Sequence, residues 1–205
     1  MGYRQSHKLQ LDSVAAQLAG VEEENIYMVE HPPVFTLGRN GSTASLLLPE
    51  EKIMEAGVEI VATERGGDIT YHGPGQLVVY PILNLRKRKI AVSEFISMLE
   101  DVMLATATDY GVLANRDARN RGIWVGNRKL GSVGIRIRHG ISFHGLALNV
   151  ALSLEHFRWI QPCGLSGVQM TMLSQQSRQE MSVEEVKSNM RGHIIDILAG
   201  DEEVK

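Results

Sequence analysis

The sequence of 205 residues contains only one cysteine, Cys163, and no long apolar run. A single cysteine excludes an intramolecular disulfide, and a lone thiol is better tolerated in a reducing compartment. No stretch approaches the roughly 20 apolar residues of a membrane helix, and the polar first residues lack the apolar core of a secretory signal. We therefore expect a cytoplasmic protein with no membrane partner.

The sequence also lacks a strong charge of either sign, since its formal net charge is −3. Nothing in that balance favours a nucleic acid as a partner. The Walker A pattern and the Gly-x-Gly-x-x-Gly pattern of nucleotide sites are absent, as are His-Glu-x-x-His and paired cysteine ligands. We accordingly expect no nucleotide cofactor and no metal.

The length of 205 residues predicts one catalytic domain over residues 1–205. Helical spacing covers residues 3–19, 93–111 and 182–200, with Ser93 as the expected N-cap of the second helix. Short β-branched or aromatic runs predict strands at 25–30, 57–63, 68–71 and 76–83, and a second sheet region at 123–125, 130–138 and 141–150. Hairpins between helices predict an α+β fold, or α/β in looser usage, with a mixed, mostly antiparallel sheet flanked by helices.

Cys163 stands between Pro162 and Gly164, which predict a turn that would expose the thiol. A free cysteine is more often a small buried hydrophobe than a nucleophile. A catalytic thiol needs a nearby cation that lowers its pKa from about 8.5. Candidates are Lys129, His72 and His144, and the residues alone do not rank them.

The densest cluster of functional residue types lies in the glycine-rich segment 64–76. Its four glycines allow the backbone to approach a ligand closely, and Arg65, Tyr71, His72 and Gln76 supply polar groups that could orient that ligand. The segment is therefore a candidate wall of a binding pocket.

Together, these segments closely resemble the lipoyl(octanoyl) transferase family, whose members move octanoyl groups from acyl carrier protein to lipoyl domains. The resemblance runs from Tyr3 to about residue 175, through 30–38, 65–76, 129–134, 144–149 and the turn at Cys163. Several separated motifs in the same order are more specific than any one of them.

The resemblance implies that Cys163 carries the acyl group as a thioester and that Lys129 lowers the pKa of its thiol. It implies a fold similar to the catalytic domain of biotin and lipoate protein ligases, and supporting roles for His144, Gln76 and Asn149. The residues that it places around the acyl group are Arg65, Gly66, Gly67, Asp68, Ile69, Thr70, Tyr71, His72, Ser132, Val133, Gly134, Gly145, Leu146 and Ala147.

The resemblance also implies the partners: octanoyl-acyl carrier protein as donor, and lipoyl domains of 2-oxoacid dehydrogenase complexes and the glycine cleavage H protein as acceptors. Because such domains are acidic, the basic run at residues 86–89, with Arg136 and Arg138, is expected to attract them. Neither ATP nor a metal is implied.

Three other functions remain open at this point. An ATP-dependent lipoate or biotin ligase would activate a free carboxylate and would not need Cys163. A Cys-His thioesterase would use His72 or His144 as base and water as acceptor. A non-catalytic module would only bind the acyl group.

Overall fold

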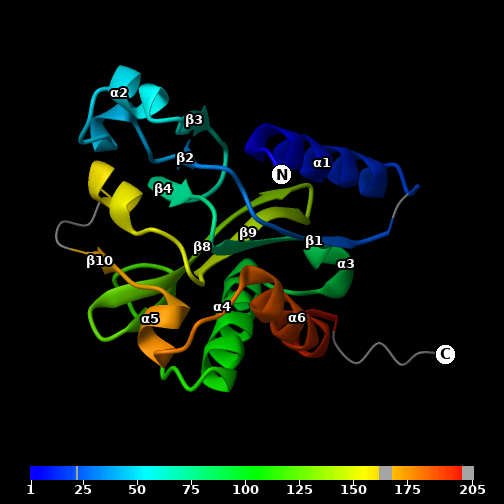
Figure 1. Cartoon of the computed structure of the whole chain (residues 1–205). Helices are drawn as coiled ribbons and strands as arrows, with labels where there is room; N and C mark the ends of the chain where they lie inside the picture. Colours follow the sequence, from blue (N-terminus) through cyan, green and yellow to red (C-terminus); the bar gives the residue numbers. More distant parts are fainter. Residues whose placement is uncertain (22, 162–167, 200–205) are drawn as a thin grey trace.

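The computed structural model describes residues 1–21, 23–161 and 168–199, and its strands form two sheets (Figure 1). Within this part of the chain, a large sheet has the strand order β1-β5-β9-β8-β7-β6, with β10 paired to β8, and a small sheet has the order β3-β2-β4. The strands are β1 (Asn25–Val29), β2 (Val34–Leu37), β3 (Glu59–Ala62), β4 (Ile69–His72), β5 (Gln76–Ile82), β6 (Asn115–Arg116), β7 (Gly122–Val125), β8 (Arg128–Arg138), β9 (Ile141–Asn149) and β10 (Gln169–Met170).

Helices cover both faces of the large sheet (Figure 1). The long helix α4 and the C-terminal helix α6 pack on one face, and α1 packs on the other against β5 and β9. No helix in the described ranges is both long and apolar enough to cross a membrane. The helices are α1 (Tyr3–Leu18), α2 (Glu50–Glu55), α3 (Leu85–Arg88), α4 (Val92–Asp109), α5 (Leu173–Ser177) and α6 (Val183–Ile194), with short turns at η1 (Thr43–Ser45), η2 (Glu155–Trp159) and η4 (Ile195–Ala199).

Strand β5 shows why this sheet is covered on both sides. Leu77 and Val79 pack into the core beneath α4 and α6, whereas Val78, Tyr80 and Ile82 pack on the α1 side. Successive side chains of a strand point to opposite faces, so a strand that is apolar at every position requires two covering layers. The continuous apolar run from residue 77 to 82 therefore places β5 in the middle of the molecule.

The predicted α+β class and the mostly antiparallel sheet are confirmed. His139 and Gly140 form the expected turn of the β8–β9 hairpin, where both adopt positive φ. The expected second sheet region is wrong, because β7, β8 and β9 join β1 and β5 in one sheet. The second sheet instead includes β2, whose four residues are too few to show a hydrophobic period.

Helix α4 begins one residue before the predicted N-cap. Ala91 takes the N-cap position, and its N–H donates to the Glu94 carboxylate at 3.3 Å. A glutamate at this third helical position replaces a side-chain cap from the N-cap residue itself. Ser93 therefore lies inside the helix, and its C=O accepts a hydrogen bond from the Ser97 hydroxyl.

Candidate active site

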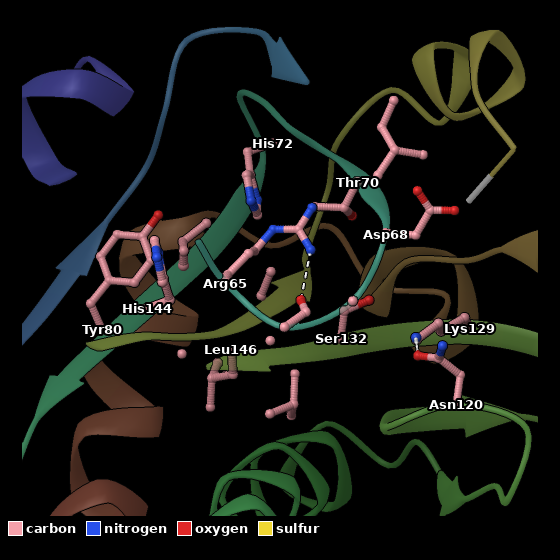
Figure 2. Close-up of a pocket in the computed structure, with 18 of the residues that line it drawn as sticks. Arg65, Asp68, Thr70, His72, Tyr80, Asn120, Lys129, Ser132, His144 and Leu146 are labelled. Atoms are coloured by element: carbon pink, nitrogen blue, oxygen red, sulfur yellow. Dashed lines mark hydrogen bonds between the residues drawn. The ribbon is translucent and has the colours of Figure 1, made fainter. Parts of the chain in front are cut away.

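A cavity lies where the large sheet, the glycine-rich segment and the N-terminal end of α1 meet (Figure 2). All the residues expected around an acyl group, except Tyr71, line it. The lining residues that the sequence singled out are Arg65, Gly66, Gly67, Asp68, Ile69, Thr70, His72, Lys129, Ser132, Val133, Gly134, His144, Gly145, Leu146 and Ala147.

Tyr71 of β4 was expected around the acyl group but does not line the cavity. Its ring packs on Phe35 and Phe157 and stacks on His156 at 4.7 Å between ring centroids. Thr70 and His72, its neighbours in the strand, line the cavity, so the alternation of side chains along β4 turns Tyr71 to the opposite face. Tyr71 thus belongs to the core of the small sheet.

The glycine-rich segment lies directly on β8. Gly66 N–H donates to the C=O of Ile135 at 2.9 Å. This hydrogen bond fixes the segment against β8 at the side of the cavity. A Cβ on Gly134 would stand only 3.1 Å from the C=O oxygen of Gly66. Glycine at residue 134 therefore permits this close approach.

Arg65 brings a positive charge to the cavity wall but is held rigidly. Its guanidinium donates to the Thr36 hydroxyl at 3.0 Å, to the Thr36 C=O at 2.5 Å and to the Gly66 C=O at 3.0 Å. The residue is buried, and Figure 2 shows its side chain crossing the cavity region. These hydrogen bonds fix the position of the Arg65 guanidinium. A fixed charge in the cavity wall can orient a polar group of a bound ligand.

Lys129 is buried, unlike an ordinary surface lysine, and only 1% of its surface is exposed. Its Nζ donates to Asn120 Oδ1 at 2.5 Å (Figure 2). The same Nζ lies 5.4 Å from the centroid of the Trp124 ring. Trp124 in turn donates its indole N–H to the Asn120 C=O. An amide oxygen and an aromatic face both favour the ammonium form against the cost of burial.

A chain of buried hydrogen bonds joins His72 to the backbone of Lys129. His72 Nδ1 pairs with Gln76 Oε1 at 2.7 Å, and the Gln76 amide donates to Asn149 Oδ1 at 2.9 Å. Asn149 donates to the Thr171 C=O, and Thr171 N–H donates to the Lys129 C=O, each at 2.9 Å. Gln76 and Asn149, two of the three expected supporting residues, thus lie behind the cavity wall and hold it in position.

Cys163 lies outside the described residues, as do Pro162 and Gly164 beside it. The structure describes the chain on either side, up to residue 161 and from residue 168. Gln161 N–H donates to the Ser45 C=O, and the Ser45 hydroxyl donates to the Asp68 carboxylate of the cavity. On the other side, Met170 of β10 pairs with Lys129 in parallel register.

The end of the cavity away from Lys129 is built from rings. Tyr3 stacks on His72, with 6.0 Å between centroids and 8° between planes, and Tyr80 bonds His31 Nε2 through its hydroxyl at 2.9 Å. Burial lowers the pKa of His72 to about 3 and raises that of Tyr3 to about 12. Burial also lowers the pKa of His144. These rings are therefore neutral at physiological pH.

Four lining residues were not singled out from the sequence, namely Tyr3, Val78, Tyr80 and Asn120. Val78 and Tyr80 carry the signal of a buried strand, which does not distinguish a core position from a cavity wall. Asn120 lies in the irregular segment before β7, so no period or spacing links it to Lys129. Tyr3 marks the start of the family resemblance, the one signal that could have found it.

The basic run at residues 86–89 is partly tied down. Arg88 pairs with Glu24 and donates to the Leu198 C=O, so this side chain is committed to holding α3 against the C-terminal helix region. The expectation that all four side chains attract a partner is wrong for Arg88, because its charge is already paired with Glu24. The two residues are far apart in the sequence, so no local pattern predicted this ion pair. Arg86, Lys87 and Lys89 remain expected steering residues.

The comparison with family models and known proteins decides the family. The model of the lipoyl protein ligase A/B catalytic domain matches residues 3–195. An octanoyltransferase from Desulfotalea psychrophila is 46% identical over 187 residues, which cover 90% of this chain and 84% of that protein. This chain belongs to the lipoyl protein ligase A/B catalytic domain family.

Solved structures of a lipoate protein ligase and a biotin protein ligase share the fold at low identity. A bipartite lipoate protein ligase from Thermoplasma acidophilum has a TM-score of 0.72 at 12% identity, covering 93% of this chain and 79% of that one. A biotin protein ligase from Aquifex aeolicus has a TM-score of 0.51 at 14% identity, covering 81% of this chain and 70% of the other. The expected similarity to biotin and lipoate ligases is therefore confirmed for the fold.

Proposed function

We propose that this chain transfers an octanoyl group from octanoyl-acyl carrier protein to a lysine of a lipoyl domain, through a thioester on Cys163. The similarity to an octanoyltransferase over nine-tenths of the chain supports the reaction class. The observation that carries the proposal is the position of Lys129. Its buried ammonium faces the cavity from the strand that pairs with Met170, seven residues beyond Cys163.

In the first step, the Cys163 thiolate attacks the carbonyl carbon of the donor thioester. A new C–S bond forms, the old one breaks, and the carrier thiolate leaves and takes a proton from the Lys129 ammonium, which becomes a neutral amine. The exchange converts one thioester into another and needs no energy source. The ammonium of Lys129 favours the attacking thiolate by charge.

In the second step, the lysine amine of the acceptor attacks the Cys163 thioester. An amide C–N bond forms, the C–S bond breaks, and the Cys163 thiolate leaves. The amine must lose a proton, and the neutral Lys129 left by the first step lines the cavity and accepts it. Asn120 Oδ1 positions its Nζ for both steps.

The cavity suits an acyl chain with one polar end. Val133, Leu146 and Ala147 provide apolar wall between the two strands β8 and β9, whereas Arg65 and Lys129 provide charge. Because a thioester carbonyl develops negative charge when it is attacked, fixed donors beside it lower the barrier. The octanoyl tail would then lie along the apolar wall.

The transfer as proposed uses neither a nucleotide nor a metal, because the acyl group arrives already activated. The donor and acceptors are octanoyl-acyl carrier protein, lipoyl domains of 2-oxoacid dehydrogenase complexes and the glycine cleavage H protein, met in the cytoplasm. The bipartite ligase from Thermoplasma acidophilum is described together with its E2 lipoyl domain, which supports this acceptor class.

Intact-mass spectrometry tests the proposal without ATP. Incubation with octanoyl-acyl carrier protein should add one octanoyl group to the chain, and apo lipoyl domain should remove it while gaining the same mass. A Cys163→Ala variant should neither form the adduct nor transfer. Transfer at the wild-type rate by Cys163→Ala, or an absolute requirement for ATP, would overturn the proposal in favour of a ligase.

A further inference from the structure

Three potential metal ligands meet beside the ring-lined end of the cavity, where one of them, His144, forms part of the lining. His7 comes from α1, Glu64 from the segment before β4, and His144 from β9. The Glu64 Oε2 atom lies 3.2 Å from His7 Nε2 and 3.8 Å from His144 Nε2, and the three ligand atoms lie within 4.8 Å of one another. They are far apart in the sequence, so no motif spacing predicts the group.

Three imidazole nitrogens of this group are buried and have no hydrogen-bond partner among the described residues. His144 is 1% exposed, and neither of its ring nitrogens has a hydrogen-bond partner among the described residues. His7 Nε2 is also buried and makes no hydrogen bond. The Glu64 oxygen is 3.2 Å away but does not lie at a hydrogen-bonding angle to this nitrogen. Buried polar atoms without partners are rare in folded proteins, and an unfilled ligand site is one explanation.

The backbone holds His144 in this position. It adopts a φ of 55° inside strand β9, and its N–H donates to Gln10 Oε1 of α1 at 2.7 Å. A left-handed residue within a strand is uncommon for any residue other than glycine, and such strain often marks functional positions. The ring of His144 stacks on that of His7, with 5.3 Å between centroids and 18° between planes.

We propose that His7, Glu64 and His144 bind one transition-metal dication, with Zn²⁺ as the preferred ion. Two imidazole nitrogens and one carboxylate are a ligand set for zinc, whereas Ca²⁺ and Mg²⁺ require oxygen ligands. Ligand atoms around a tetrahedral zinc lie about 3.3 Å apart, so the pairs that include Glu64 already stand near the required spacing. The fourth position is left for water from the cavity.

One fixed positive charge lies near the group. The Arg65 guanidinium lines the same cavity as His144, and its hydrogen bonds to Thr36 hold it in place.

The site is separate from the proposed transfer chemistry. His144 pairs with Ile135 on β8, six residues along the strand from Lys129, which corresponds to about 20 Å. Figure 2 also shows His144 and Lys129 at opposite ends of the cavity. A bound ion would join α1 to β9 and close the ring-lined end, without touching the reacting thioester.

Metal binding to the full chain, stripped with a chelator and without any acyl donor, tests this inference. Equilibrium dialysis should show one tightly bound Zn²⁺, and Co²⁺ should give the visible absorption of a four-coordinate site. His7→Asn and Glu64→Gln should each weaken Zn²⁺ binding at least tenfold. His7 and Glu64 are preferred to the buried His144 because their replacement endangers folding less, and circular dichroism verifies the fold.

Two matched controls locate the ion. Cys163→Ala should bind Zn²⁺ as wild type does, because the proposed ligands do not include the thiol, and His139→Asn in the exposed β8–β9 turn should do likewise. Wild-type affinity in His7→Asn, loss of binding in Cys163→Ala, or no stoichiometric binding in wild type would overturn the site. None of these results depends on octanoyl transfer, so the two proposals fail independently.

Discussion

The two ends of the cavity differ in how their polar groups are satisfied. At one end, Lys129 has the Asn120 amide oxygen and the Trp124 ring around its ammonium, and its backbone C=O accepts from Thr171. At the other end, the Tyr3 hydroxyl and both nitrogens of His144 are buried without a hydrogen-bond partner in the described structure.

This difference indicates two kinds of site. A charge with several partners has a fixed position, which catalysis on a bound thioester requires. Neutral rings with open hydrogen-bonding capacity favour a ligand that completes them. The Lys129 end is thus arranged for chemistry, and the ring-lined end for recognition or metal binding. Changes at the two ends should therefore have separable effects.

The largest effect is expected from Lys129→Met. Loss of the ammonium removes its charge from the thiolate and its amine from the second step, so octanoyl transfer at neutral pH should fall about 100-fold. Part of the loss should be recovered at higher pH, where the thiol ionises unaided. Steady-state transfer assays from pH 6 to about 9.5 measure this. Lys87→Met on α3 is the control, and equal losses in both variants would remove Lys129 from the mechanism.

Gly145→Ala should destabilise the ring-lined end through a steric clash. A Cβ at this position would stand 2.0 Å from the Val79 C=O oxygen, so β5 and β9 must separate. We expect the free energy of unfolding to fall by about 2 kcal/mol in urea denaturation. Gly192→Ala in α6, where a Cβ meets nothing within 4 Å, should leave stability unchanged or raise it. Equal stability of the two variants would contradict the close approach.

The neutral state of His72 predicts a pH dependence of stability. Its pKa is about 3 in the fold and about 6.5 when unfolded, so the unfolded chain binds more protons between these values. Stability should therefore decrease as the pH falls below 6.5. Between pH 7 and pH 5, the wild type should lose about 2 kcal/mol more than His72→Gln in urea titrations. Parallel pH profiles for the two proteins would show that His72 is not buried in its neutral form.

Asn120→Ala should have the smallest effect. The substitution removes one hydrogen bond from the Lys129 ammonium while Trp124 stays in place, so transfer should slow about fivefold, equivalent to about 1 kcal/mol. The pH optimum should shift, because the amide oxygen stabilises the charged form of Lys129. Asn127→Ala in the exposed β7–β8 turn provides the control. An unchanged pH profile in Asn120→Ala would mean that Trp124 and burial alone position the lysine.

The sequence predicted the long elements well and the short ones poorly. Residues 3–18 and 92–109 have enough length for a helical period to emerge, whereas β2 and α2 have four and six residues. The family resemblance named most of the lining of the cavity, but it included Tyr71, which the alternation of side chains along β4 turns away, and it did not name Val78, Tyr80 or Asn120. Contacts that join distant segments, such as Asn120 with Lys129 and His7 with Glu64, carry no local pattern.

The pH dependence of Cys163 alkylation tests the central claim most directly. The chain has no other cysteine, so the rate of modification by iodoacetamide, followed by mass, reports this thiol alone. If the Lys129 ammonium acts on Cys163, the midpoint of the rate profile should lie about one pH unit or more lower in wild type than in Lys129→Met. Coincident profiles with a midpoint near that of a free thiol, about 8.5, would contradict the pairing of Cys163 with Lys129.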